Sequence, residues 1–206
     1  MPHRLDINIE PAQTTLVPKN IFDPKLEQVF AELNFGFDTK SQVVLSETSG
    51  DIVFLSIVDK KMYDKAMCMF PNGRFFSTYR LLFQIFKKLT CADKRSKHQV
   101  FANIMPNSFD LFIFEKNQRL IFANTFVYQS SNDFLYYFLH AVNRLKVDTG
   151  GLTLKVSGIS ELSKELIPVL EPYFLSIVEL SSNENPLNLR MCIQPGLSLI
   201  NPALCE

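Results

Sequence analysis

The chain has 206 residues, 47% of them hydrophobic and 20% charged, which is the balance of a globular protein and excludes a disordered chain. Its 21 basic and 21 acidic residues cancel, so no strong net field is available to attract nucleic acid or an anionic membrane surface. The 19 phenylalanines, with no tryptophan, favour a core packed from aromatic rings.

The cysteines and histidines are scattered along the chain. The 4 cysteines form no CxxC pair, and the histidines at positions 3, 98 and 140 share no ligand spacing, so we expect no metal site and no disulfide framework. The N-terminus has no apolar signal core, and no window approaches the length of about 18 apolar residues that a membrane span needs. We therefore expect a cytoplasmic protein that does not cross a membrane.

The first half is predicted to combine short strands and helices. Residues 4–11 alternate apolar and polar side chains as a half-buried strand does, and residues 14–18 continue extended up to a proline. A helix is expected over 22–33, with Asp23 as its N-cap and an apolar stripe of Leu26, Val29, Phe30 and Leu33. The elements expected next are strands at 42–45 and 51–58, a helix at 59–70, a turn at 71–73 and a helix at 78–89 capped by Ser77.

The second half follows a polar linker at 90–98, which predicts domains at 1–92 and 93–206. The elements expected after the linker are strands at 99–105, 110–116 and 119–126, a helix at 134–145 begun by Ser130, a strand at 152–159, a helical stretch at 160–174 and a strand at 175–180. Pro168 predicts a kink or a break in the last helix. The order of elements is β-β-β-α-β-α-β.

The helix at 134–145 is unusually aromatic. At 100° per residue its apolar side chains cover an arc of about 200°, which predicts that the helix packs against protein on more than one side. Tyr136, His140 and Arg144 lie in one line on the opposite face, where they are a candidate for lining a cleft. The ordinary polar face of an amphipathic helix explains the same line, and the lack of a catalytic partner favours that interpretation.

Several segments carry a resemblance to a known family. These segments are "TTLVPKNIFD" (14–23), "LIFANTFVYQSSNDFLYYFLHAVNRL" (120–145), "LKVSGI" (154–159) and "LINPALCE" (199–206). They resemble a Bacteroidota-type bacterial family, a domain of unknown function with an actin-like ATPase fold. The resemblance implies an α/β chain of actin-like ATPase (ribonuclease-H-like) architecture, with two βββαβαβ-type halves of which the N-terminal half is shortened.

The resemblance also implies where nucleotide contacts would lie. Actin-like ATPases hold phosphates on hairpins of the DxG type, since a glycine lets the backbone approach the anion closely. Here Asp6 is followed by Ile-Asn and Asp110 by Leu-Phe, without glycine in either case. The adenosine-side turn of that superfamily usually has a glycine pair, whereas Ser157 and Gly158 provide only one glycine. We therefore expect no nucleotide and no other cofactor, with Ser157 and Gly158 kept as candidate cleft residues.

One basic cluster, at Lys94, Arg95 and Lys97, could contact phosphates, but it lacks the interleaved aromatic residues of nucleic-acid-binding surfaces. The sequence predicts a non-catalytic protein-binding or scaffold protein on a degenerate actin-like fold, with an unknown protein partner and neither nucleic acid nor membrane as a partner. One alternative is a nucleotide-binding ATPase whose phosphate loops are divergent or lie in a missing N-terminal segment. The other is an RNA-associated adaptor that uses the basic cluster.

Overall fold

The computed structural model describes residues 6–36, 38–91, 97–158, 160–180 and 198–199. The chain divides into two compact units: the first unit is Met1–Phe83 with Asn185–Glu206, and the second unit is Gln84–Glu184. The division falls within helix α3 (Thr78–Thr90), upstream of the linker on which the expected domains 1–92 and 93–206 rest. Those limits therefore stay a prediction.

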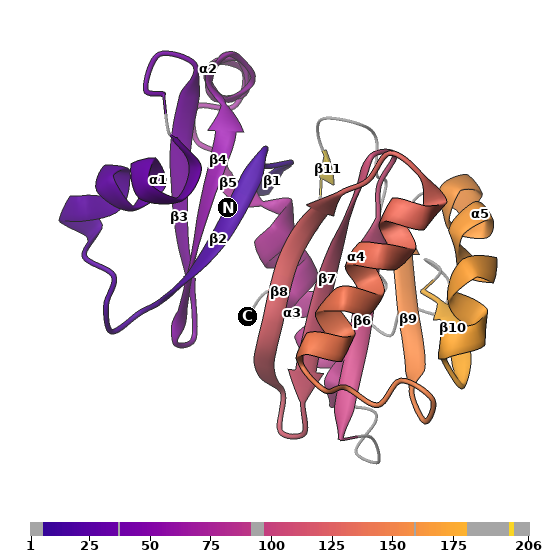
Figure 1. The fold of residues 1–206 in the computed structure, drawn as a ribbon. Coiled ribbons are helices and arrows are strands. Elements are labelled where there is room, and N and C mark those ends of the chain that lie inside the picture. Colours follow the sequence, from indigo (N-terminus) through magenta and orange to yellow (C-terminus); the bar gives the residue numbers. More distant parts are fainter. Residues whose placement is uncertain (1–5, 37, 92–96, 159, 181–197, 200–206) are drawn as a thin grey trace, which may run out of the picture. The chain divides into compact units, whose positions relative to one another are not determined.

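The first unit contains two small sheets (Figure 1). Strands β2 (Gln13–Pro18), β4 (Ile52–Asp59) and β3 (Gln42–Ser49) form an antiparallel sheet in that order. In the other sheet β1 (Asp6–Ile9) pairs in parallel with β5 (Arg74–Ser77) and antiparallel with β11 (Ser198–Leu199). The sequence did not predict β5, because a strand of four residues has little periodicity and this one pairs with a strand far away in the chain.

Two helical segments of the first unit begin at aspartate caps, of which Asp23 was predicted. Asp23 accepts a hydrogen bond from the backbone N–H of Lys25 and begins the 3-10 turn η1 (Pro24–Leu26), which leads into α1 (Glu27–Phe35). Asp59 accepts from the N–H of Met62 and begins α2 (Lys60–Met69). Both caps satisfy backbone donors that the first helical turn leaves unpaired.

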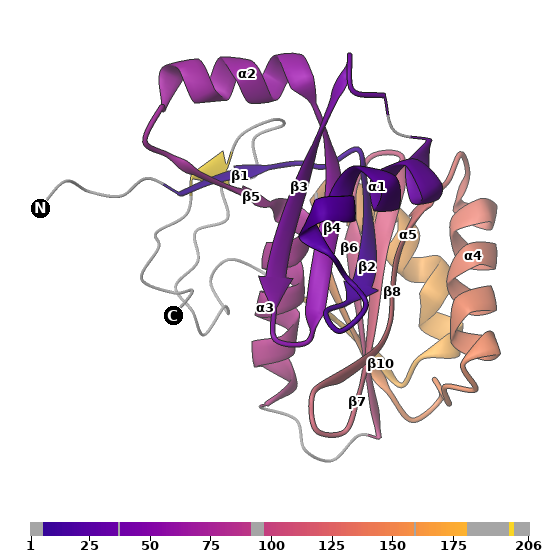
Figure 2. The ribbon, with the colours of Figure 1, turned by 90° about the vertical axis from the view of Figure 1, so that its left-hand side faces the viewer.

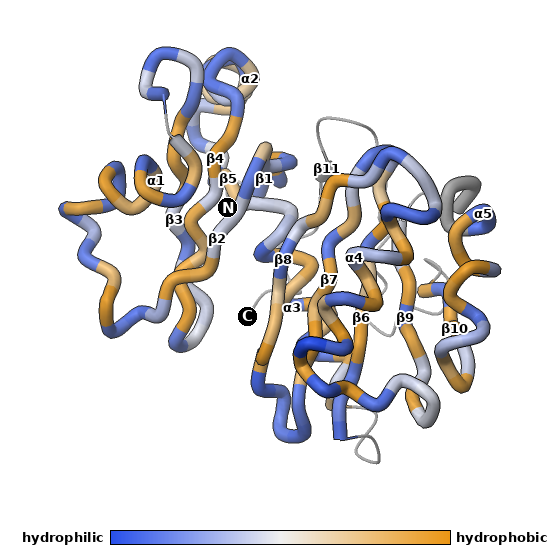
Figure 3. Tube along the Cα trace, in the orientation of Figure 1, coloured by the Kyte–Doolittle hydropathy of each residue, from blue (hydrophilic) through white to orange (hydrophobic). Residues whose placement is uncertain are grey.

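Three of the four residues in the predicted apolar stripe are exposed, and the fourth, Phe30, is half-buried. Leu26, Val29 and Leu33 are 48%, 48% and 80% exposed, whereas Ala31 is fully buried where α1 packs on β3 and β4. The first of these, Leu26, belongs to the 3-10 turn, so it does not continue the spacing of the α-helix. Periodicity identifies an apolar face, which the hydropathy colours of α1 mark in Figure 3, but it does not say what covers that face.

The second unit has the predicted order of elements around a five-stranded sheet, β10-β9-β6-β7-β8. Strands β6 (His98–Ile104), β7 (Ser108–Glu115) and β8 (Arg119–Val127) form an antiparallel meander. Strands β9 (Thr153–Gly158) and β10 (Ser176–Glu179) add in parallel beside β6, after helices α4 (Ser131–Arg144) and α5 (Ser160–Leu170) with the 3-10 turn η2 (Glu171–Tyr173).

The two faces of this sheet are covered by different helices (Figure 2). The face that carries Ala102, Leu111 and Val156 packs against α4 and α5 in one hydrophobic core. On the other face Phe101 stacks on Phe86 of α3, with ring centres 4.8 Å apart. Nine phenylalanines are among the largest fully buried side chains, or seven if only the second unit is counted, so the predicted aromatic core is present.

Helix α4 packs most of its apolar arc against the sheet and α5, although Tyr137 of that arc is 38% exposed. Its buried side chains are Phe134, Phe138, Ala141 and Val142, and Leu135, Leu139 and Leu145 are partly buried against the same core. The helix begins at Ser130, whose hydroxyl accepts the N–H of Asp133. Helix α5 contains Pro168 and continues beyond it to Leu170, so it is not broken at the proline. No helix of the described part of the chain is long and apolar enough to span a membrane.

Candidate functional site

A row of four polar side chains crosses the sheet of the second unit. Thr125, Asp110, Asn103 and Ser157 are partners in the register of β8, β7, β6 and β9. Thr125 Oγ1 donates to Asp110 Oδ1 at 2.6 Å, and Asn103 Nδ2 donates to Asp110 Oδ2 at 3.1 Å. Ser157 Oγ donates to Asn103 Oδ1 at 3.1 Å. Both oxygens of the carboxylate are therefore occupied within the sheet.

Asp110 is 2% exposed, and burial raises its pKa to about 6, although the hydrogen bonds from Thr125 and Asn103 lower it. A buried carboxylate is tolerated when its acceptor oxygens are paired, which the register of this sheet achieves. The row lies on the face opposite α4, because side chains alternate along a strand and Ala102, Ile104 and Leu111 face α4. Asp110 is thus a structural carboxyl rather than an exposed ligand.

The structure places Ser157 and Gly158 apart from the other candidate cleft residues. Ser157 is 7% exposed and belongs to the buried polar row. Gly158 has φ +126°, and a Cβ atom there would lie 2.0 Å from the carbonyl oxygen of Ile104. This close approach of β9 to β6 requires glycine, so the packing of the two strands explains Gly158 without a ligand.

Tyr136, His140 and Arg144 are all exposed on α4. Tyr136 is 63% exposed, and its ring lies over that of His140, with centres 5.8 Å apart and an interplanar angle of 23°. Tyr137, which the sequence assigned to the apolar arc, is 38% exposed and stacks on Phe126 of β8. Tyr136, Tyr137 and His140 therefore form an exposed aromatic surface, with Arg144 at the end of the same helix.

The basic cluster is only partly described. Lys94 and Arg95 lie outside the described residues, and Lys97 is exposed immediately before β6. The prediction about this cluster stays a prediction.

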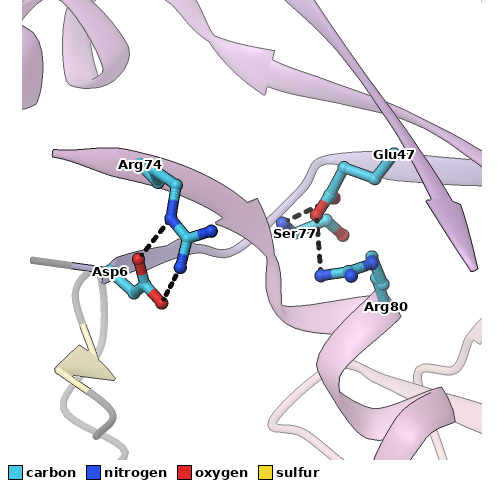
Figure 4. A network of polar contacts seen from close by, with 5 residues as sticks. All are labelled: Asp6, Glu47, Arg74, Ser77 and Arg80. Carbon is cyan, nitrogen blue, oxygen red and sulfur yellow. Dashed lines mark hydrogen bonds and ion pairs between the residues drawn. The ribbon is translucent and has the colours of Figure 1, made fainter. Parts of the chain in front are cut away.

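A second polar network lies in the first unit (Figure 4). Arg74 Nε and Nη2 donate to Asp6 Oδ1 and Oδ2, each at 2.8 Å, across the parallel pair β5 and β1. A two-point pair of this kind is the strongest geometry between a guanidinium and a carboxylate. Asp6 is the residue that was compared with the aspartate of a DxG phosphate hairpin. In the structure it is paired with an arginine of its own sheet.

Glu47 of β3 lies beside the start of α3. Its Oε2 accepts the backbone N–H of Ser77 at 2.8 Å, and its Oε1 is 3.5 Å from Arg80 Nη1. Burial raises the pKa of Glu47 to about 7, against the lowering effects of the Ser77 N–H and the Arg80 charge. A carboxylate beside the N-terminus of α3 also interacts favourably with the positive end of the helix dipole.

Ser77 directly precedes α3, as predicted, but its hydroxyl makes no capping hydrogen bond. The Oγ atom is buried and has no hydrogen-bond partner among the described residues. The negative group next to the first turn of α3 comes instead from Glu47, through the Ser77 N–H. The predicted side-chain cap was therefore wrong, although the helix begins at the predicted residue.

Sequence reasoning did not find Glu47. A signal was present, since Val43 and Leu45 are partly buried on one face of β3 and Glu47 is the next residue with the same orientation. A charged residue at an apolar position of an alternating strand indicates a buried partner. Nothing in the sequence identifies that partner as Arg80 or Ser77. Among the residues that the structure describes, no group of His, Cys, Asp and Glu side chains is arranged to hold a metal ion.

Comparison with known protein families identifies the family of this chain. Residues 3–177 match the model of the family described as "Protein of unknown function (DUF3822)". The chain belongs to this DUF3822 family. No curated protein sequence matches the chain.

A solved structure gives the fold of this DUF3822 protein an experimental counterpart. It is a protein of Bacteroides thetaiotaomicron with an actin-like ATPase fold and unknown function, similar with a TM-score of 0.76 and 20% identity over 90% of this chain and 71% of that chain. The resemblance drawn from the sequence segments is thereby confirmed, both for the family and for the actin-like ATPase fold. At this identity the similarity shows the fold alone.

Two further structures are more distant. The PilM-PilN type IV pilus biogenesis complex gives a TM-score of 0.44 at 11% identity, over 86% of this chain and 69% of that chain. The cytoplasmic domain of EpsL, an inner membrane component of the type II secretion system of Vibrio cholerae, gives a TM-score of 0.36 at 11% identity. The similarity covers 73% of this chain and 59% of that chain. The assignment of the fold rests on the Bacteroides structure.

Proposed function

We propose that this DUF3822 protein is a non-catalytic, protein-binding member of the actin-like fold. The observation that carries the proposal is the state of the two carboxylates that were candidates for phosphate hairpins. Asp110 has both oxygens bound by Asn103 and Thr125, and Asp6 has both oxygens bound by Arg74. A metal-positioning acid needs an oxygen that the ion can reach, whereas Asp110 is 2% exposed and Asp6 is 6% exposed.

Gly158 supports the same conclusion. In a nucleotide site a glycine lets a ligand approach the backbone, but here the space beside Gly158 is occupied by the Ile104 carbonyl. The rival function is a nucleotide-binding ATPase with divergent loops. Isothermal titration of the intact chain with ATP and Mg²⁺ separates the two functions. We expect no heat of binding, and a stoichiometric, Mg²⁺-dependent micromolar dissociation constant would overturn the proposal.

The surface proposed for a protein partner is the exposed aromatic surface of α4. Tyrosine supplies a large contact area with few rotatable bonds and a polar hydroxyl, and for this reason it is enriched in protein interfaces. Tyr136 is 63% exposed although it is large and aromatic, and His140 and Arg144 extend the surface along the helix. Their outward position means that substituting them disturbs no packed core.

Affinity purification from the native cells tests this surface. The bait is the full chain, compared with a variant in which Tyr136, His140 and Arg144 are all replaced by alanine. Tyr173→Ala is the matched control, because Tyr173 is 40% exposed and lies on η2. We expect a partner that is retained by wild type and by the control but lost from the triple variant. A partner set that the triple variant leaves unchanged would refute the assignment of this surface.

A further inference from the structure

A cavity of about 530 Å³ opens within the first unit. Its lining includes Glu47 of β3, Arg74 and Phe75 of β5, Tyr63 and Met67 of α2, and Arg80 of α3. Volumes of this size hold small molecules, and such sites are typically apolar with a few convergent polar groups. This cavity is more polar than such sites usually are, because charged side chains line it together with aromatic ones. It lies in the other unit from the α4 surface proposed for a partner protein.

The polar groups of the cavity are incompletely paired. Glu47 Oε1 and Arg80 Nε are both buried and have no hydrogen-bond partner among the described residues. The Glu47 side chain is only 9% exposed, and its 3.5 Å approach to Arg80 Nη1 is an ion pair without a well-formed hydrogen bond. Buried polar atoms are nearly always satisfied in native proteins, so this acceptor and this donor are available to a polar group of a ligand or to water.

Phe76 holds the two arginines of the cavity in place. The guanidinium carbons of Arg74 and Arg80 each lie 5.2 Å from the centre of its ring. An aromatic ring attracts a cation over its face, so Phe76 stabilises both guanidinium groups at this distance. The cavity therefore presents two positioned guanidinium groups beside the apolar side chains of Tyr63 and Phe75, whose ring centres are 5.2 Å apart.

The charges around Glu47 do not remain balanced at every pH. The ionic groups among the described residues near the cavity are Arg80, Arg74 with Asp6 behind it, and Glu47 itself, with Tyr63 as a further titratable group. With Glu47 ionised, the two pairs cancel. With Glu47 protonated, Arg80 carries one unbalanced positive charge. Burial brings the pKa of Glu47 to about 7, so both states are populated near neutral pH.

We propose that this cavity binds a small organic anion, whose anionic group lies against Arg80 and whose apolar body packs on Tyr63, Met67 and Phe75. A guanidinium is the preferred partner of carboxylate and phosphate oxygens because its N–H groups match their geometry. Protonated Glu47 donates a further hydrogen bond to the same group, and ionised Glu47 repels it. Binding is therefore coupled to uptake of a proton by Glu47. This inference stands independently of the proposed protein-binding function.

Titration of the full chain with three probes tests the proposal. Phenylacetate and phenyl phosphate carry the two anionic groups on one aromatic body, and phenylacetamide is the uncharged control. We expect binding of at least one anion, followed by isothermal titration or by NMR, and no binding of the amide. Phenylacetate reports the carboxylate source and phenyl phosphate the phosphate source. If neither anion binds, or if the amide binds equally well, the proposal is wrong.

The dependence on pH gives a second readout. Since Glu47 must be protonated, the affinity for phenylacetate should fall about tenfold from pH 6 to pH 8, as expected for a group whose pKa is about 7. Glu47→Gln should bind the anion with an affinity that no longer depends on pH over this range. A pH dependence that persists in this variant would refute the role of Glu47.

Two variants localise the site. Arg80→Gln removes the guanidinium and should abolish binding, with circular dichroism to verify the fold. Met67 lines the cavity and is 36% exposed, so Met67→Glu adds a negative charge at the cavity without disturbing a core. We expect it to weaken anion binding at least about threefold, which is the effect of roughly half a pKa unit of repulsion. Met69→Glu, on the same helix but outside the lining, is the matched control and should bind normally. Equal affinity in the Met67 and Met69 variants would overturn the location.

Discussion

Replacing Asp110 by asparagine should make the second unit more stable at alkaline pH. The carboxyl is 2% exposed, and its pKa in the folded protein is about 6, above the ordinary value of 3.8. Between these two values the folded state holds a proton that the unfolded state has lost. The contribution of Asp110 to stability is therefore fully present below pH 3.8 and is lost as the pH rises through 6.

The size of the effect follows from the pKa. At pH 5 the group lies about one unit below its folded pKa, and at pH 8 it is fully ionised in both states. Raising the pH from 5 to 8 should therefore remove about 1.4 kcal/mol of unfolding free energy through this residue. Asparagine has no charge to bury, so Asp110→Asn should show no such loss.

The hydrogen bonds of the row can adapt to an amide in place of the Asp110 carboxyl. The amide of Asn103 can rotate by 180°, so that its oxygen accepts from the introduced amide nitrogen and its own nitrogen donates to Ser157, whose hydroxyl can act in either role. Thr125 can continue to donate to the oxygen of the introduced amide. Each side chain of the row therefore keeps at least one hydrogen-bond partner in the variant, which limits the effect of lost hydrogen bonds beside the charge effect.

Urea denaturation followed by circular dichroism measures the prediction at pH 5 and pH 8. The difference in unfolding free energy between Asp110→Asn and wild type should shift by about 1.4 kcal/mol in favour of the variant at the higher pH. Asp148→Asn is the control, because Asp148 is an exposed aspartate of the same unit and should show no comparable shift. If the difference in unfolding free energy between Asp110→Asn and wild type is the same at pH 5 and at pH 8, as expected for Asp148→Asn, burial does not raise the pKa of Asp110.

Three further substitutions test the fold by urea denaturation. Gly158→Ala should cost on the order of 3 kcal/mol or more, since φ is +126° and the new Cβ would meet a backbone carbonyl, whereas Gly151→Ala has open space and should cost less than about 1 kcal/mol. Ser130→Ala should cost about 1 kcal/mol by removing the cap of α4, and Ser131→Ala, one residue further, should be nearly neutral. Leu33→Ser should change stability by no more than about 0.5 kcal/mol because Leu33 is 80% exposed; a larger loss would contradict its exposed position.

The second unit could be predicted from the sequence because its order is set by neighbours in the chain. The meander β6-β7-β8 joins strands through short turns, and α4 returns over the sheet it has just left. The arc of α4 was informative for the same reason, since the apolar side of the helix from Phe134 to Leu145 meets one local core. Gly158 is different, because the Ile104 carbonyl that excludes a Cβ atom there comes from β6, far away in the chain.

The first unit could not be predicted to the same extent. The pairing of β1 with β5 joins residues 6–9 to residues 74–77, and no local pattern specifies that parallel pair. The stripe of α1 was predicted from its spacing alone, whereas the buried residue of that helix is Ala31. Short side chains such as alanine give a weak periodic signal, whereas large exposed ones such as Leu33 give a strong and misleading one.

Two buried carboxyls of the chain differ in how completely their oxygens are hydrogen-bonded. Asp110 lies opposite Asn103 and Thr125 in the register of a regular sheet, so the pairing that orders the strands also satisfies both of its oxygens. Glu47 lies at the junction of a strand and a helix, where one oxygen meets the Ser77 N–H and the other is left without a hydrogen bond among the described residues. Burial raises the pKa of both groups, but only the second has an unused acceptor beside a cavity with two arginines. A raised pKa therefore does not distinguish a structural carboxyl from a functional one, and the completeness of its hydrogen bonding does.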